Sequence, residues 1–333
     1  MQLDFHYYCI GALARMSGFL PEQALTIAYA SQYVDDATES EPVRVGDIRF
    51  DPVRTAHKGL TSFTWDVQQK IYMAFHFIPP YPVDSLDASF VTAPGSPFAA
   101  RLWERAISES DGLMRLCFIG TALHTIADAT SHSCFSGRRN KENDVEAICL
   151  FQNGEYRHLF WQNLLYDLWP QIGHAEAGAY PDLSFLKWRY KNHSGNEIVR
   201  NNPGEYLKAA EIIFNDLCEI SPKEDTVHEW DEISGSISGL LLYEDQDLQK
   251  RCSKWRDEFS ESFQPEPYLY DRLEWRRIAL AENNDDRVSW DKKRPSHFAT
   301  LRFEMSPGFF DSAWVNFHRA ALRHRDFVLE NMV

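Results

Sequence analysis

The sequence lacks the features that mark exported or membrane-spanning proteins. No uninterrupted apolar run approaches the roughly 20 residues that a membrane helix needs. The first residues, MQLDFHYYCIGALARMSGF, have no basic n-region and no small-residue cleavage site. The six cysteines are scattered, without a C-x-x-C pair or a disulfide framework. We therefore expect a soluble protein without a transmembrane segment, located in the cytoplasm.

Positive charge is also scarce. The 333 residues hold 34 Lys and Arg against 49 Asp and Glu, which gives a formal net charge of -15. Long nucleic acid would meet a repulsive field, because binding a phosphate backbone needs a basic track. No Ser-His-Asp elbow, P-loop or dinucleotide fingerprint is present. These absences leave a small-molecule substrate as the expected partner.

Helical periodicity dominates what the sequence does contain. It predicts helices at 4–18, 21–38, 98–109, 111–132, 155–169, 203–220, 244–262, 267–282 and 308–332. Between about 40 and 100, Pro, Gly and β-branched residues predict irregular chain with a short hairpin in VRVGDIRF. The segments 173–185 and 192–204 are expected to be loops. The predicted fold class is all-α: a single domain over 1–333, with metal ligands mainly in 1–180 and a helical remainder in 200–333.

One stretch, LHTIADATSH at 123–132, sets His124, Asp128 and His132 four residues apart. On a helix these side chains fall within a stripe about 80° wide. Gly120 and Leu116 extend the stripe backward, so it should face inward, where an uncompensated polar group is costly. Histidine and aspartate are common ligands of zinc, iron and manganese, and the stripe therefore predicts a metal site.

Other candidate ligands are spread along the first half of the chain: His6, Asp35, Asp36, His76 and His174. His6 lies on the inward face of the first helix, and His76 stands among apolar residues in AFHFIPP. Asp35 and Asp36 end a helix, where the helix dipole is already negative and an acidic pair invites a cation. The sequence does not decide which of the two binds, nor whether His57 or Asp182 joins the site. A core or surface role is the alternative for each of these residues.

These segments resemble the superfamily of zinc-dependent phospholipases C and single-strand-specific nucleases. The resemblance rests on His6, the acidic pair in SQYVDDAT, His76 in FHFIP, the His124–Asp128–His132 helix and His174, and it covers residues 1–180. It implies an all-helical fold with a cluster of up to three zinc ions. FHYY, SQYVDD, LHTIADATSH and GHAEAG are also similar to an uncharacterised bacterial family of comparable length, which adds no functional expectation.

The sequence departs from the superfamily pattern in ways that favour two ions over three. In the superfamily the mature N-terminal amine is a ligand, whereas five residues precede His6 here. The step from Asp128 to His132 is shorter than the pattern, and a second His-x-x-x-Asp/Glu is not clean. We expect two, and at most three, divalent transition metals, with zinc first and iron or manganese as alternatives.

The ligand set predicts a metal-dependent hydrolase, a phosphoesterase acting on a small phosphate ester. Asp128 is the predicted catalytic residue, because its two oxygens and central position suit a bridge between two ions. A metal-bound hydroxide would then be the nucleophile. One alternative is a dinuclear iron oxygenase or oxidase using the same cluster. Another is a non-enzymatic, metal-stabilised interaction protein with a binding surface in the aromatic-rich second half.

Overall fold

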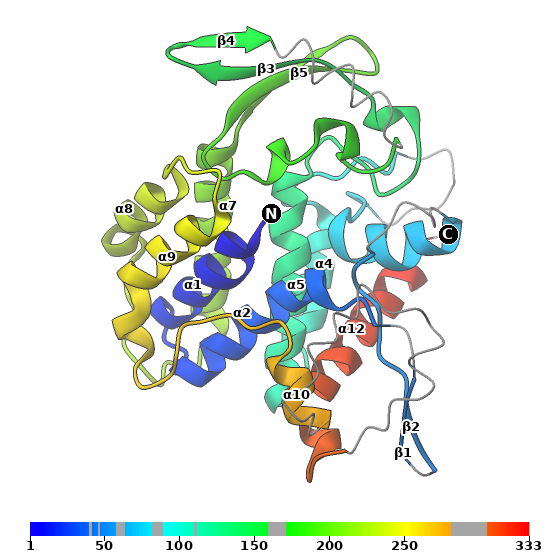
Figure 1. Ribbon diagram of the computed structural model, residues 1–333, viewed down its shortest axis with the longest axis vertical. Helices are drawn as coiled ribbons and strands as arrows, with labels where there is room; N and C mark the ends of the chain where they lie inside the picture. Colours follow the sequence, from blue (N-terminus) through cyan, green and yellow to red (C-terminus); the bar gives the residue numbers. More distant parts are fainter. Residues whose placement is uncertain are drawn as a thin grey trace.

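A long central helix, α5 (Gly112–Ser131), organises the helical body of the molecule (Figure 1). The computed structural model describes residues 1–39, 42–45, 47–57, 64–81, 89–109, 112–158, 171–280 and 305–332. Three helices pack along α5: α2 (Pro21–Asp36), α4 (Pro97–Ile107) and α12 (Ala313–Glu330). Most of α5 is buried, which is expected of a helix surrounded by others.

Two segments of the body are π-helical, and each carries a candidate ligand. The first helix begins as η1 (Asp4–Cys9) and continues as α1 (Ile10–Met16). The short α3 (Trp65–Val67) continues as η2 (Gln68–His76). The wider π-helical turn is frequent at functional sites. His6 lies in η1, and His76 is the last residue of η2, where the chain turns toward the prolines of FHFIPP.

The remaining helices flank this body, with α7, α8 and α9 grouped beside α1 (Figure 1). They are α7 (Asn202–Ile220), α8 (Trp230–Leu241), α9 (Leu248–Phe259) and α10 (Glu274–Leu280). Short 3₁₀ turns complete the described elements: Lys141–Asn143, Ala175–Ala177, Tyr180–Asp182, Ser260–Phe263 and Phe309–Asp311. Most predicted helices are present among the described residues. Of the predicted helix 267–282, the described part, 267–280, is helical only in α10, and α8 was not predicted.

Gly120 allows α2 and α5 to approach closely. A Cβ atom built on Gly120 would lie 2.3 Å from the carbonyl oxygen of Ile27 and 2.7 Å from Cβ of Ala30. Both distances are too short for real atoms, so only glycine fits without moving one helix. Because the candidate ligands Asp35 and His124 lie one to two turns further along the same two helices, this close packing brings them together.

A four-stranded antiparallel sheet forms a lobe at one end of the body, at the top of Figure 1. Its strands are β3 (Val145–Gln152), β4 (Glu155–His158), β5 (Lys187–Asn192) and β6 (Glu197–Asn201), in the order β4-β3-β5-β6. Trp188 and Tyr190 alternate inward from β5 and pack with Ile148 and Phe135 in a small core of their own. A separate hairpin pairs β1 (Val43–Val45) with β2 (Ile48–Phe50), as predicted.

The all-α prediction is therefore wrong, because the chain has a mixed fold with two antiparallel sheets. The predicted helix 155–169 begins as strand β4; its remainder, from 159, lies outside the described residues. The predicted loops at 173–185 and 192–204 lead into β5 and contain β6. Strand pairing joins residues distant in sequence, such as Leu150 and Trp188, and local periodicity does not report such pairs.

Arg200 of β6 joins the sheet lobe to the end of α5. Its guanidinium donates to the carbonyl oxygens of Thr130 (2.9 Å), Ser131 (3.1 Å) and Ser133 (3.2 Å), and it pairs with Glu205 of α7. Carbonyls at a helix C-terminus have no partner within the helix, and a buried cation is a favourable one. This contact fixes the last turn of α5, which carries Asp128 and leads directly to His132.

None of the described helices is both long enough and apolar enough to cross a bilayer.

Candidate metal centre

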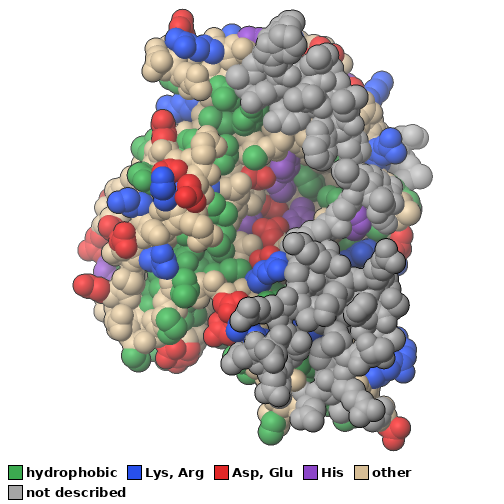
Figure 2. Space-filling model, in the orientation of Figure 1, with side chains coloured by type: hydrophobic (Ala, Val, Ile, Leu, Met, Phe, Trp, Pro, Cys, Tyr) green, Lys and Arg blue, Asp and Glu red, His purple; other side chains and the backbone are tan. Residues whose placement is uncertain are grey.

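Eight histidine and aspartate side chains converge near the N-terminus of the chain, at the C-terminal end of α5. They form three groups whose ligand atoms lie within 4.8 Å of one another. We call these the inner group (His6, His124, Asp128), the rim group (Asp35, His76, His124) and the loop group (His132, His174, Asp182). Figure 2 shows histidine and acidic side chains gathered in a hollow on this face of the molecule.

Asp128 is the common partner of the histidines from the helical body. Its Oδ1 lies 3.1 Å from Nε2 of His6, and its Oδ2 lies 3.1 Å from both Nδ1 of His76 and Nε2 of His124. Asp35 stands on the opposite side, with Oδ1 3.8 Å from the same two nitrogens of His76 and His124. The predicted helical stripe and three segments distant in sequence therefore meet at one carboxylate.

The loop group forms where the chain leaves α5 and passes beneath the sheet lobe. Asp182 lies between two histidines: its Oδ1 is 3.2 Å from Nε2 of His132, and its Oδ2 is 3.3 Å from Nε2 of His174. The ring of Phe77 stacks on His132, with 4.4 Å between centroids. The 3₁₀ turn Tyr180–Asp182 thus brings in a ligand that the sequence left open.

Backbone carbonyls orient three of the histidines. His76 Nε2 lies 3.0 Å from the oxygen of Thr55, His132 Nδ1 lies 2.8 Å from that of His76, and His174 Nδ1 lies 2.8 Å from that of Gly178. A carbonyl oxygen can only accept, so each of these nitrogens carries the proton. The other ring nitrogen then faces Asp128 or Asp182. This arrangement is typical of histidines that bind metal.

The α-amine of Met1 also lies inside the centre. It is buried, 2.5 Å from Oδ1 of Asp128 and 3.2 Å from Oδ1 of Asp182, and it bonds Ser131 Oγ at 3.1 Å. In the sequence, the five residues before His6 counted against the amine as a ligand. In the structure these residues coil into the first turn, so the amine and His6 reach the same carboxylate oxygen.

The charges of the centre are balanced by burial and by opposite charges. Burial alone would raise the pKa of Asp128, but His132, the α-amine, His124 and His6 lower it well below its usual range. Burial lowers the amine pKa, yet Asp128, Asp182 and Asp35 raise it to about 11. The negative charge that keeps the amine protonated can also hold a divalent cation, because metal ions compete with protons for amines and carboxylates.

Two of the histidines have the protonation state that metal binding requires. Burial lowers the pKa of His6 well below its usual value, and the neighbouring His124 and amine lower it further. Burial likewise lowers the pKa of His174, against the opposing charge of Asp182. A neutral imidazole keeps a lone pair available for a metal. The neutral imidazoles of His6 and His174 and the ionised carboxylate of Asp128 therefore fit a transition metal chemically.

Seven of the predicted ligands fall within these groups, and one does not. Asp36 points away from the centre, toward Tyr270 and Gln32. Of the two residues left open, Asp182 joins the loop group, whereas His57 lines the cavity of the centre without belonging to a group. The sequence reasoning missed the Met1 amine and the orienting carbonyls. For Asp182, the sequence signal was its short distance from His174 within the same predicted loop.

A cavity of about 240 Å³ opens onto the centre. Its walls include His76, Asp128, His132, His174 and Asp182 together with apolar side chains such as Ile71 and Phe77. All three groups contribute a wall residue, so a small molecule in this space would touch each of them.

Fold and site together define a helical protein with a sheet lobe and a buried histidine–aspartate centre. The chain belongs to DUF6765, a family of unknown function, whose model matches residues 1–332. No curated protein and no solved structure matches the chain. The resemblance to zinc-dependent phospholipases C and nucleases therefore stays a prediction.

Proposed function

We propose that this chain is a metal-dependent hydrolase that cleaves a small phosphate ester at a centre of two divalent transition metals. The observation that carries the proposal is the orientation of His76, His132 and His174. Each donates one ring N–H to a backbone carbonyl and turns the other nitrogen toward a shared carboxylate. A histidine that only packs in the core would not have to share a carboxylate with other histidines.

The rim and loop groups are the better candidates for ion sites. One ion would be held by Asp35, His76, His124 and Asp128, and a second by His132, His174 and Asp182. Nδ1 of His6 and Nδ1 of His124 both have no hydrogen-bond partner among the described residues, so no carbonyl orients these two rings. Because His124 belongs to both the inner and the rim group, two separate ions cannot each use its Nε2. This sharing favours two ions over three.

The ligand composition favours a hydrolytic zinc centre over an iron centre that activates oxygen. Di-iron sites in helical bundles use mainly glutamates with two histidines, whereas this centre has five histidines and three aspartates. Two bound divalent ions would lower the pKa of a coordinated water. They would also act as Lewis acids that stabilise the negative charge on the phosphoryl oxygens. The chain's own groups have positioning roles: Asp128 orients three histidines, and Phe77 packs over His132 away from solvent.

The test begins with metal content and continues with hydrolysis. Protein purified without chelator is analysed for zinc, manganese and iron. It is then assayed with p-nitrophenyl phosphate, bis-p-nitrophenyl phosphate, nucleotides and phospholipids, before and after chelation and metal return. We expect about two ions per chain, activity abolished by chelator, and no activity in Asp128→Asn, which keeps the shape but removes the charge.

Absence of turnover of every ester under each of the three metals would overturn the proposal. The iron alternative predicts instead a coloured protein that consumes oxygen with an organic substrate. The His193→Ala variant serves as a control, because His193 is exposed on the sheet lobe and belongs to none of the three groups.

A further inference from the structure

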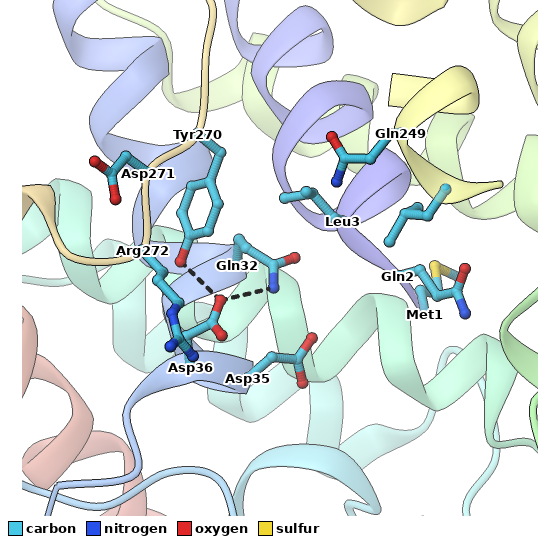
Figure 3. A pocket seen from close by; sticks show the side chains of 11 residues that line it. Met1, Gln2, Leu3, Gln32, Asp35, Asp36, Gln249, Tyr270, Asp271 and Arg272 are labelled. Carbon is cyan, nitrogen blue, oxygen red and sulfur yellow. Dashed lines mark hydrogen bonds between the residues drawn. The ribbon is translucent and has the colours of Figure 1, made fainter. Parts of the chain in front are cut away.

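A second, larger cavity of about 550 Å³ adjoins the metal centre (Figure 3). Met1 and Asp35 line both cavities, so the two share a wall. The larger one lies between the end of α2, the first residues, the start of α9 and the segment before α10. Its volume falls within the range of small-molecule sites. A molecule held at the ions could therefore extend past Asp35 into this space.

Asp36 and Gln32, one turn apart on α2, form the polar wall of this cavity. Tyr270 Oη (2.9 Å) and Gln32 Nε2 (3.2 Å) both donate to Oδ2 of Asp36. Arg272 lines the same space, and Figure 3 shows its side chain beside the Asp36 carboxylate. Because a carboxylate only accepts, Nε2 of Gln32 must face Asp36 and its Oε1 must point elsewhere.

The amide oxygen of Gln32 lacks a partner despite its burial. Gln32 is only 7% exposed, and its Oε1 has no hydrogen-bond partner in the described part of the chain. Figure 3 shows this oxygen pointing away from Asp36 into the open space of the cavity. A buried acceptor without a partner is costly, and it is usually satisfied by water or by a ligand. One unsatisfied acceptor thus faces this space.

The wall selects against several ligand classes. An acyl chain would leave the Gln32 oxygen unsatisfied, and a second phosphate group would meet the three carboxylates of Asp35, Asp36 and Asp271 against the single guanidinium of Arg272. Hydroxyl groups suit it, because each can donate to a wall oxygen and still accept from another group. Gln2 offers such a donor: its carbonyl oxygen accepts from Arg251, which leaves its amide N–H groups for other partners.

We propose that this cavity binds the hydroxylated part of the substrate, and that the substrate class is a polyol or sugar phosphate ester. The proposal rests on the proposed function for the position of the phosphate. One hydroxyl of the substrate donates to Oε1 of Gln32 and a neighbouring hydroxyl to the carboxylate of Asp36, while the phosphoryl group lies beyond Asp35 at the metal centre. Asp36 and Gln32 are therefore specificity residues rather than metal ligands.

Matched pairs of esters test this assignment. Glycerol 3-phosphate is compared with propyl phosphate, and myo-inositol 1-phosphate with cyclohexyl phosphate, so that each pair differs only in its hydroxyls. For zinc-loaded protein we expect kcat/KM to be at least ten-fold higher for the hydroxylated member of at least one pair. Asp36→Asn and Gln32→Met should each reduce that preference at least five-fold. Asp257→Asn, which removes the same charge about two turns beyond the cavity on α9, should keep it.

A binding measurement separates this inference from the hydrolase proposal. Saturation-transfer NMR compares myo-inositol 1-phosphate with cyclohexyl phosphate on the zinc-loaded protein, whether or not either is hydrolysed. Stronger, Gln32-dependent binding of the inositol ester supports the cavity assignment even if no ester turns over, in which case only the proposed function fails. Equal binding and equal hydrolysis within both pairs would overturn the assignment and leave a phosphoesterase without hydroxyl recognition. Zinc content and thermal melting of each variant identify any that fail to fold.

Discussion

The helical body and the sheet lobe contribute to the metal centre in different ways. The body supplies His6, Asp35, His76, His124 and Asp128 from helices, whose positions follow from close packing. The chain beside the lobe supplies His174 and Asp182 from short 3₁₀ turns, where a hydrogen bond to Gly178 orients the histidine. Side chains on packed helices are fixed by the core, whereas those on turns depend on local hydrogen bonds. Ligands of the body should therefore matter to stability as well as to metal binding.

The largest effect should follow from Asp128→Ala. This carboxylate contacts the histidines of the helical body and also the Met1 amine, which lies beside the loop group. We expect loss of at least one ion per chain and at least a 1000-fold loss of phosphoesterase activity. The buried amine and histidines would lose their counter-charge, at a cost of about 3–5 kcal/mol in the free energy of unfolding. Elemental analysis and thermal melting measure both effects. Full metal retention would contradict the central role of Asp128.

Gly120→Ala tests the packing of the body without touching a ligand. The added methyl group would overlap the backbone of α2 at Ile27, so α2 must move away from α5. We expect a loss of about 2–3 kcal/mol in unfolding free energy and weaker metal binding through displacement of Asp35. Gly235→Ala on α8 is the matched control, because nothing lies within 4 Å of its added Cβ. In that helix alanine should stabilise by about 0.5–1 kcal/mol. Similar melting temperatures for the two variants would show that the close approach is unimportant.

His174→Ala should separate the loop group from the body. We expect one ion to be lost and the other retained, with a change below about 1 kcal/mol in the stability of the chelator-treated protein, because the side chain lies on a turn. Titration of the protein with zinc, followed by calorimetry, should show one binding event fewer than in the wild type. If both ions disappear, the two regions form one inseparable site, and the comparison made above does not hold.

The smallest effect concerns the body far from the ligands. Burial, aided by Glu219, raises the pKa of Asp216 on α7 to about 6. Since the folded protein disfavours the ionised form, the penalty is present above pH 6 and disappears as the pH falls toward the unfolded value near 4. Asp216→Asn should raise Tm by about 1–2 °C at pH 8 and leave it unchanged at pH 4. Melting curves in excess chelator exclude metal effects. A gain of equal size at both pH values would assign it to something other than ionisation.

The contrast between body and lobe also explains what the sequence could predict. The His124–Asp128–His132 stripe follows from helical periodicity, and the structure brings all three residues into the centre. The ends of α2 and α5 were predicted to within two residues. Strands β3 to β6 were missed because their pairing depends on partners far along the chain, although the alternation of Trp188 and Tyr190 was a visible indication. The acidic pair at the end of α2 was recognised, but only the three-dimensional packing places Asp35 in the rim group and turns Asp36 toward Tyr270.

The contact of Arg200 with the end of α5 has a consequence for how the protein unfolds. One buried guanidinium satisfies three carbonyls of the central helix end from a strand of the lobe. If the lobe detached alone, the carbonyls and the Arg200 cation would lose each other as partners. Opening the lobe alone would therefore cost nearly as much free energy as unfolding the described body and lobe together. The described body and lobe should consequently lose their structure in one cooperative transition. Hydrogen exchange of the Thr130 and Ser131 amides would then follow the same opening event as the amides of β6.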